Sequence, residues 1–355
     1  MAISSLRAAV TSVVVLGLAA LPAACGDSIS NPISPLNNFA QANLIADAAG
    51  ATTIDANLVN PWGIAFGPTG ILWVSNNGTG TSTLYSGTGT KNALTVTVPG
   101  VAVLGAGTPT GVVFNSTTNF LIPGAGAALF VFAGEDGTVA AWNMSTGSAA
   151  HVVADRSANG AVYKGVAIAS NAGANFLYLT NFAQSRVDVF DGSYAFVRSF
   201  SDPGIPTGFA PFGIANIGGQ LFVTFAKQQA SDKTNDQPGA GNGFVDVFNA
   251  DGTLSKRFAS NGPLNSPWAV TAAPASFGAF SQDILVGNFG DGKLLAYNAS
   301  TGAFVDVMRD HNKNPIVING LWGLEFGPAA GSSTLYFASG PGGEQHGLVG
   351  TLTAQ

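Results

Sequence analysis

A short motif that returns six times along the chain constrains the fold more than any other feature. It first appears at residues 60–76 as NPWGIAFGPTGILWVSN, where a Pro-Trp-Gly start leads into two apolar strands separated by a Gly-Pro turn. Related segments follow as PTGVVF, KGVAIA, PFGIAN, PWAVTA and GLWGLEFG. Taking Gly63 as the marker, the repeat falls at spacings of 48, 54, 48, 56 and 54 residues, on Gly111, Gly165, Gly213, Ala269 and Gly323. A period of about fifty residues with four strands per unit is typical of propeller blades. The sequence therefore predicts an all-β fold, a six-bladed β-propeller.

The last repeat provides only three strands before the chain ends. A blade of three strands would leave an unpaired sheet edge, which favours aggregation. The segment QANLIA, from Gln41 to Ala46, is strand-like and precedes the first repeat. We therefore predict that this N-terminal strand completes the last blade and closes the ring, so that the propeller spans residues 39–355.

The first 38 residues have the composition of an export signal and a linker. Arg7 precedes an apolar run from Ala8 to Ala20, which is too short to span a bilayer comfortably, and small residues follow it. Residues 1–24 are therefore predicted to be a signal peptide. The segment before Cys25 resembles a bacterial lipoprotein signal, which implies lipidation of this cysteine and an outer-membrane or periplasmic location. Simple cleavage and secretion is the alternative. Residues 25–38, rich in Ser, Asn and Pro, are predicted to form a flexible tether.

Composition excludes some classes of function. Only 9% of the 355 residues are charged, the net charge is -6, and the 13 basic residues are scattered, so no basic surface for nucleic acid is expected. Contact with a membrane is expected only through a lipid at Cys25. Because that residue is the only cysteine in the chain, no disulfide is expected within it.

Distinctive motifs in every blade resemble a family of exported bacterial six-bladed propellers that has no assigned function. The motifs are NPWGIAFGPTG, FVFAGEDGTVAAWN, YKGVAIA, LYLTNF, LVGNFGDG and INGLWGLEFGP. More distantly, the blades are similar to NHL repeats and to the calcium-dependent lactonase and phosphotriesterase propellers. The close resemblance implies a propeller of unknown role. The distant one implies either ligand and protein binding or metal-assisted hydrolysis.

Polar residues at equivalent turns are predicted to gather on one face, around the mouth of the central channel. These turns contain Asn76, Glu135, Asn181, Asn288 and Glu344. Amide and carboxylate oxygens suit Ca²⁺, and the lactonase resemblance implies calcium held by Glu and Asn, although Asn60 stands where that family has Glu. The alternative is that Asn and Asp are only turn residues here, accepting left-handed backbone and making local hydrogen bonds.

An insert in the fourth blade, from Ala226 to Gly243, is the most unusual loop. Asp232 and Asp236 stand four residues apart among Asn and Gly, a spacing that can wrap a calcium ion. The acidic pattern of an EF-hand loop is missing. The alternative is a surface lid without metal, and loops of this length are frequently functional.

Four aromatic residues occupy equivalent positions at the start of four blades. Trp62, Phe212, Trp268 and Trp322 are candidates for stacking a sugar or aromatic ligand over the channel, and the alternative is that they pack between blades. For catalysis, His346 beside Glu344 is a candidate general base, with Glu135 as a second candidate. No serine nucleophile elbow or phosphate-binding loop occurs in the sequence.

Taken together, these features favour an exported ligand- or protein-binding scaffold whose partner is an unknown protein or small molecule. A calcium-dependent hydrolase of lactones or esters is the alternative, and a carbohydrate-binding module is a further one. Fold alone does not choose among them.

Overall fold

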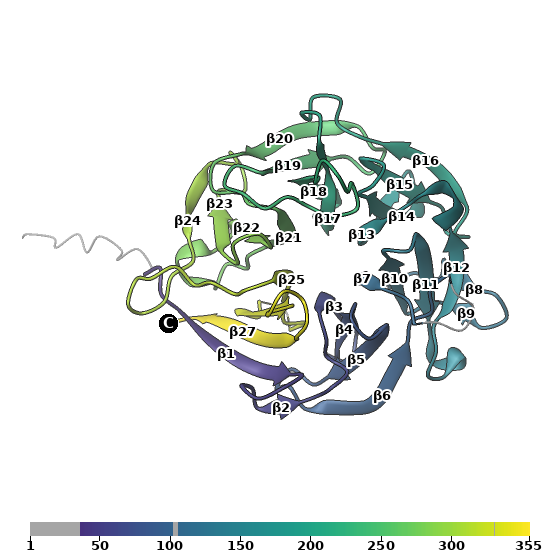
Figure 1. Cartoon of the computed structure of the whole chain (residues 1–355), viewed down its shortest axis with the longest axis horizontal. Helices are drawn as coiled ribbons and strands as arrows, with labels where there is room; N and C mark the ends of the chain where they lie inside the picture. Colours follow the sequence, from purple (N-terminus) through teal and green to yellow (C-terminus); the bar gives the residue numbers. More distant parts are fainter. Residues whose placement is uncertain (1–35, 102–105, 330) are drawn as a thin grey trace, which may run out of the picture. The chain divides into compact units, whose positions relative to one another are not determined.

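The computed structural model describes residues 36–101, 106–329 and 331–355, which form six antiparallel sheets around a central axis (Figure 1). The six-bladed β-propeller that the repeats predict is therefore confirmed. The predicted signal peptide, Cys25 and all but the last three residues of the predicted tether lie outside the described residues.

Each blade has four main strands, the first of them innermost. Blade one contains β3 (Pro61–Phe66), β4 (Leu72–Asn76), β5 (Thr81–Tyr85) and β6 (Lys91–Thr97). Blade two contains β7 (Pro109–Phe114), β10 (Phe130–Gly134), β11 (Thr138–Trp142) and β12 (His151–Asp155). Blade three contains β13 (Tyr163–Asn171), β14 (Ala174–Asn181), β15 (Arg186–Phe190) and β16 (Phe196–Phe200).

The remaining blades continue around the ring. Blade four contains β17 (Phe209–Ile217), β18 (Gln220–Lys227), β19 (Gly243–Phe248) and β20 (Leu254–Ser260). Blade five contains β21 (Pro267–Ala272), β22 (Ile284–Asn288), β23 (Leu294–Tyr297) and β24 (Phe304–Val307). Blade six contains β25 (Leu321–Phe326), β26 (Thr334–Ser339), β27 (Leu348–Ala354) and β1 (Phe39–Ala46), with the two-residue β2 (Thr53–Ile54) at its outer edge.

Blade six joins the two ends of the described chain. β1 runs antiparallel to β27, with Gln41 opposite Leu352 and Ala46 opposite Leu348. β2 lies parallel to the end of β1. Just before β1, the Asn37 side chain donates a hydrogen bond of 2.9 Å to the carbonyl oxygen of Val307 in blade five. The N-terminal strand is thus the fourth main strand of the last blade.

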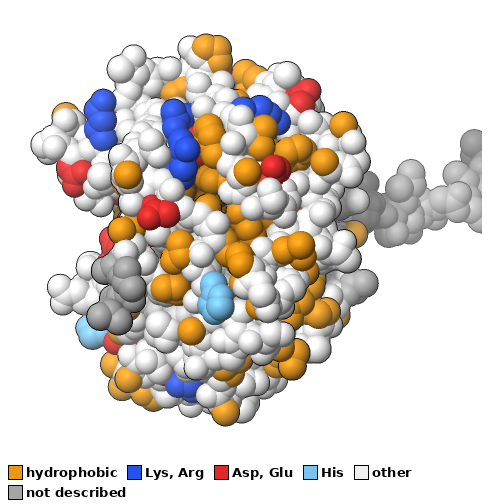
Figure 2. Space-filling view, turned by 90° about the vertical axis from the view of Figure 1, so that its right-hand side faces the viewer, with side chains coloured by type: hydrophobic (Ala, Val, Ile, Leu, Met, Phe, Trp, Pro, Cys, Tyr) orange, Lys and Arg blue, Asp and Glu red, His pale blue; other side chains and the backbone are white. Residues whose placement is uncertain are grey.

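Burial decreases from the axis outward. All five residues of β4 and of β22 are buried, because both faces of these strands are covered by neighbouring blades. The outermost β16 and β24 have mostly exposed or half-buried residues. This gradient explains why the inner strands are almost continuously apolar rather than alternating. Seen from the side, the outer wall shows hydrophobic side chains among uncharged atoms, with few charged groups (Figure 2).

The repeated glycines allow the innermost strands to approach one another closely around the axis. A Cβ on Gly63 would lie 2.6 Å from the backbone nitrogen of Val112 in the next blade. A Cβ on Gly213 would overlap the carbonyl oxygen of Trp268. The marker glycine is therefore required by contact between backbones.

The connections outside the blades are short. The insert of blade two contains a small hairpin of β8 (Leu121–Ile122) and β9 (Gly126–Ala127). The helical elements described are three 3-10 turns, η1 (Met144–Thr146), η2 (Ser157–Asn159) and η3 (Gly278–Phe280). Within the described ranges, no helix has the length and apolar character needed to cross a membrane.

Candidate functional site at the channel mouth

The mouth face of the ring is the face at which the innermost strands begin and the second strands end. Its centre is closed by aromatic side chains. The rings of Trp62 and Trp322 stack with their centroids 3.5 Å apart, and Trp268 meets their edges at 6.1 and 5.9 Å. Phe212 packs against Trp322 at 5.8 Å, and Phe289 stacks on it at 3.9 Å. We call these five residues the aromatic plug.

The aromatic plug contains all four aromatic residues that the sequence predicts to bind a ligand. The exposed fractions of Trp62, Phe212, Trp268 and Trp322 lie between 1% and 8%. The rings contact one another at the centre of the ring, whereas the alternative predicted that they pack between blades. Ligand binding by these four residues stays a prediction.

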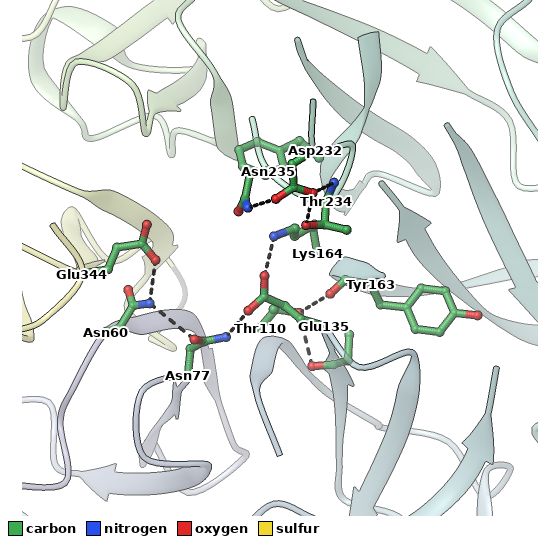
Figure 3. Close-up of polar contacts among 12 residues, drawn as sticks. Asn60, Asn77, Thr110, Glu135, Tyr163, Lys164, Asp232, Thr234, Asn235 and Glu344 are labelled. Atoms are coloured by element: carbon green, nitrogen blue, oxygen red, sulfur yellow. Dashed lines mark hydrogen bonds and ion pairs between the residues drawn. The ribbon is translucent and has the colours of Figure 1, made fainter. Parts of the chain in front are cut away.

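A chain of polar contacts lies at the mouth and crosses four blades (Figure 3). The Asn60 amide donates to Glu344 Oε2 at 2.8 Å and to Asn77 Oδ1 at 3.4 Å. The Asn77 amide donates to Glu135 Oε2 at 2.8 Å, and Glu135 Oε1 pairs with the Lys164 ammonium. We call Asn60, Asn77, Glu135, Lys164 and Glu344 the mouth network. Its members come from blades six, one, two and three.

The mouth network rests directly on the aromatic plug. The indole N–H of Trp322 donates to Asn60 Oδ1 at 3.0 Å, and that of Trp268 donates to the carbonyl oxygen of Lys164 at 2.9 Å. The Lys164 ammonium lies 5.1 Å from the centre of the Trp62 ring. Only 3% of the Lys164 side chain is exposed, whereas 26% of the Glu135 side chain is. The lysine is thus a buried charge whose partner faces solvent.

Two residues of the mouth network have left-handed backbone. Asn60 has a φ of 47° and Glu344 has a φ of 68°. Asn tolerates this conformation, but it is uncommon for Glu, and such residues persist where the surroundings hold them. The hydrogen bond between these two side chains links both positions to the same polar cluster. Two members of the mouth network therefore have strained backbone, as do residues elsewhere in the ring such as Phe120 and Tyr194.

Two carboxyl groups at the mouth hold their protons more tightly than usual. Burial raises the pKa of Glu344, and the negative charge of Glu135 adds to the effect, while the Asn60 hydrogen bond and Lys164 oppose it. Burial also raises the pKa of Asp236, against the influence of Ser266 and Lys164. Asp236 Oδ2 is buried and has no hydrogen-bond partner among the described residues. Both carboxyls are thus partly desolvated, and one oxygen of Asp236 is unpaired.

The three asparagines predicted as metal ligands use their side chains within their own blades. The Asn76 amide donates to Thr83 Oγ1 at 2.9 Å, and the Asn181 amide donates to Asp188 Oδ2 at 2.9 Å. Asn288 Oδ1 accepts from the backbone N–H of Asn265 at 3.1 Å. All three residues are fully buried at the ends of second strands. They share one face with Glu135 and Glu344, as predicted, but only those two acids join the mouth network.

The blade-four insert folds over the mouth without bringing its two predicted ligands to one ion site. Asp232 Oδ1 accepts from the backbone and hydroxyl of Thr234 at 2.9 and 2.6 Å, which holds the pKa of this exposed carboxyl low. Asp236 pairs through its backbone with Gln228 and is half-buried, with its Oδ2 enclosed. Among the described residues, no group of three or more His, Cys, Asp or Glu side chains is arranged to hold a metal. Calcium at Asn76, Glu135, Asn181, Asp232, Asp236 or Asn288 stays a prediction.

His346 is near the mouth but faces Asp47 and not Glu344. Its Nδ1 lies 2.9 Å from Asp47 Oδ2, and 57% of its side chain is exposed. Asp47 Oδ1 also accepts from the backbone N–H of Gly347 at 2.9 Å. Burial by itself raises the pKa of Asp47, but these contacts outweigh that effect and hold the pKa below its usual range. The pair connects the end of β1 to the start of β27, at the rim of the site.

Lys164 and Asn77 are not among the residues that the sequence predicts to form a site. Lys164 is the one lysine at the start of an innermost strand, in YKGVAIA, where the other blades have aromatic or small residues. Its near-complete burial beside Glu135, 29 residues away in sequence, depends on the direction of both side chains. A lysine at this position was a usable signal in the sequence, but the spacing of the residues did not indicate that Glu135 is its partner.

The chain has clear sequence relatives, although no family model matches it. It is 35% identical over 323 residues to "Uncharacterized protein R648" of Acanthamoeba polyphaga mimivirus, an alignment that covers 85% of this chain and 78% of that protein. It is 33% identical over 316 residues to "Uncharacterized protein L690" of the same virus, covering 85% of this chain and 82% of that protein. Both relatives are viral, and the expected relation to exported bacterial propellers and to lactonases stays a prediction.

Solved structures show the same fold at much lower identity. A protein of unknown function from Bacteroides thetaiotaomicron superposes with a TM-score of 0.56 at 12% identity, over 90% of this chain and 73% of that one. Virginiamycin B lyase from Staphylococcus aureus superposes with a TM-score of 0.53 at 12% identity, over 89% of this chain and 99% of that one. These similarities extend to the fold alone. By its sequence, the chain belongs to the family of propeller proteins that includes the two uncharacterised mimivirus proteins.

Proposed function

We propose that the protein is a binding protein whose mouth face takes a small polar ligand above the aromatic plug. The observation that carries this proposal is the gathering of three acids at the mouth. Glu135 pairs with buried Lys164, burial raises the pKa of Glu344, and the enclosed Asp236 Oδ2 lacks a hydrogen-bond partner among the described residues. A purely structural network satisfies its buried polar groups. Buried polar groups left short of partners are candidates for contact with a ligand.

The charges of the mouth suggest the chemistry of the ligand. Glu135, Glu344 and Asp236 contribute three carboxyl groups, and Lys164 contributes one ammonium. The acidic excess favours a ligand with at least one positive charge and several hydrogen-bond donors. The plug beneath the network forms a rigid floor, because its side chains are packed against one another. Binding would therefore need little rearrangement of the ring.

The test is selective capture of small molecules by the immobilised propeller. Wild-type protein is equilibrated with a metabolite extract of the expression host, and retained compounds are identified by mass spectrometry. We expect the wild type to retain cationic polar compounds that the Glu344→Gln variant does not retain. Asp251→Asn, which changes an exposed turn of blade four capping Thr253, serves as the matched charge control. Identical retention by all three proteins would contradict binding at the mouth.

The calcium-dependent hydrolase is tested in the same preparation. If the site at the mouth needs no calcium, a chelator should leave the melting temperature unchanged. A calcium ion bound only by the native state would stabilise the protein, so its removal would lower the melting temperature. A fall in melting temperature with chelator, together with chelator-sensitive hydrolysis of lactones or esters, would replace the binding proposal by the enzyme.

We also propose that the protein is exported and acts at the cell envelope, anchored by a lipid on Cys25. Support comes from Arg7, the apolar run and the small residues that precede this cysteine. In a bacterial host, labelling with an alkyne fatty acid should mark the wild type and not Cys25→Ala. Export of an unlabelled wild-type protein would favour simple cleavage, and retention of full-length protein in the cytoplasm would overturn export.

A further inference from the structure

A cavity of about 280 Å³ lies in the channel on the other side of the aromatic plug. Its walls are the innermost strands of the blades, from the ring of marker glycines toward the face where these strands end, and Trp268 is among its lining residues. Each innermost strand is at the edge of its own sheet, so one side of its backbone has no strand partner within that sheet. The cavity is thus bordered by backbone polar groups and mostly by small or aliphatic side chains, together with Phe66, Phe114 and Trp268.

One side chain distinguishes this cavity from a simple water-filled channel. Two residues after the marker, blades one to four place Ala65, Val113, Ala167 and Ala215, which line the cavity, and blade five places Thr271, which does not. Blade six places Glu325 at the equivalent position, and it too lines the cavity. It is the only charged residue among those that line this cavity in the described part of the chain.

Glu325 lacks the partners that acids elsewhere in the ring have. No hydrogen bond or ion pair of its carboxylate occurs with the described residues, although it is half-buried. β3 and β21, on either side of β25, carry no titratable side chain. On β26 the register partner of Glu325 is Tyr336, whose hydroxyl donates to the carbonyl oxygen of Gly87 at 2.8 Å. A desolvated carboxylate without a partner favours a cationic ligand.

We propose that this cavity binds the ammonium group of a small aliphatic amine, with Glu325 as the counter-ion. One carboxylate balances one positive charge, whereas Ca²⁺ prefers six to eight oxygen ligands that usually include several carboxylates. Ile64, Val112 and Leu324 line the same cavity and provide apolar contact for a short alkyl chain. Free backbone carbonyls of the innermost strands can accept the remaining ammonium hydrogens.

This site is separate from the proposed ligand site at the mouth. No member of the mouth network lines the cavity, and the stacked rings of Trp62 and Trp322, which contact that network, are almost fully buried. The proposal therefore neither depends on the function of the mouth nor follows from it. Failure of one leaves the other standing.

The test is calorimetric titration of the full chain with n-butylammonium chloride at pH 8. We expect saturable binding, no measurable binding of n-butanol, and at least a tenfold loss of affinity in Glu325→Gln. Burial raises the pKa of Glu325 to about 7, so the carboxyl is protonated at pH 5 while the amine stays charged. Wild-type affinity should therefore fall at least tenfold from pH 8 to pH 5, and the pH dependence should disappear in Glu325→Gln.

Two further variants make the result specific. Glu325→Asp keeps the charge on a shorter side chain, so binding should weaken but keep its pH dependence. Asp251→Asn, in an exposed turn of blade four, should leave affinity for n-butylammonium within twofold of wild type. The proposal is overturned if wild type does not bind the amine at pH 8, if Glu325→Gln binds as well as wild type, or if Asp251→Asn weakens binding as much as Glu325→Gln.

Discussion

At the scale of single residues, carboxyl groups inside this ring differ in whether they have partners. Asp55 accepts a hydrogen bond of 2.6 Å from the Tyr85 hydroxyl and one of 2.7 Å from the Lys91 ammonium. Although burial opposes them, these contacts hold the pKa of Asp55 below its usual range. Glu325 has no comparable partner, and burial raises its pKa to about 7. Asp55 therefore stabilises the fold when ionised, whereas ionised Glu325 destabilises it.

Replacing Glu325 by Gln should make the propeller more stable at alkaline pH. A carboxyl whose pKa is raised in the folded state gives its favourable contribution below the unfolded value and loses it as the pH rises through about 7. We expect Glu325→Gln to have little effect near pH 4 and to raise the free energy of unfolding by about 1 to 3 kcal/mol at pH 8. Denaturant unfolding of both proteins at the two pH values measures this. Equal stability at pH 8 would contradict a desolvated carboxylate.

Residue roles were only partly predictable from the sequence. The turn positions of Glu135 and Glu344 follow from the strand register, and both prove to lie in the mouth network. The neighbouring Asn76 occupies an equally promising position, yet its side chain turns into its own blade toward Thr83. Register fixes the face on which a residue lies, whereas side-chain direction depends on contacts with neighbouring turns that spacing does not reveal.

At the scale of elements, contact between innermost strands explains the most regular feature of the sequence. The marker glycine lies where adjacent backbones approach one another around the axis. Ala269 occupies the marker position in blade five and is buried there, so the requirement differs between blades. The repeat could be recognised in the sequence because close contact between innermost strands favours glycine at the same position in most blades.

The cost of a methyl group at the marker should depend on the blade. A Cβ on Gly213 would overlap the Trp268 carbonyl oxygen, whereas a Cβ on Gly165 would lie 3.2 Å from the Thr180 hydroxyl, its nearest neighbour. We expect Gly213→Ala to lower the free energy of unfolding by about 3 kcal/mol or more and Gly165→Ala by about 1 kcal/mol. Chemical denaturation of the two variants provides the comparison. A larger loss of unfolding free energy in Gly165→Ala than in Gly213→Ala would contradict the closer backbone contact at Gly213.

At the scale of the whole molecule, the ring depends on joining its two ends. β1 contributes buried Phe39, Ile45 and Ala46 to blade six, and it is the strand that pairs with β27. The missing strand in the last repeat made this pairing predictable from the sequence. The two-residue β2 was not predicted, because two residues carry no recognisable periodicity.

Deleting residues 39–47 should sharply lower stability, because it exposes the edge of β27 and removes those buried apolar side chains. Burial of one large apolar side chain contributes about 1.5 to 3 kcal/mol, so a loss of several kcal/mol is expected. Deletion of residues 50–54, which removes only β2 and its turn, should cost much less. The melting temperatures of both variants are measured. Equal melting temperatures of the 39–47 deletion variant and the wild type would contradict closure of the ring by β1.

The mouth network is the feature on which the proposed function depends, and it couples blades that are distant in sequence. Its most direct test is the titration of the Glu344 side-chain carboxyl carbon, followed by NMR in wild type, Glu135→Gln and Asp251→Asn. Because burial and the Glu135 charge raise the pKa of Glu344, we expect titration above the ordinary range of glutamate in wild type. Removing the Glu135 charge should lower that pKa, and the distant Asp251→Asn should not change it. An ordinary Glu344 pKa that is insensitive to Glu135→Gln would contradict the network and the binding site built on it.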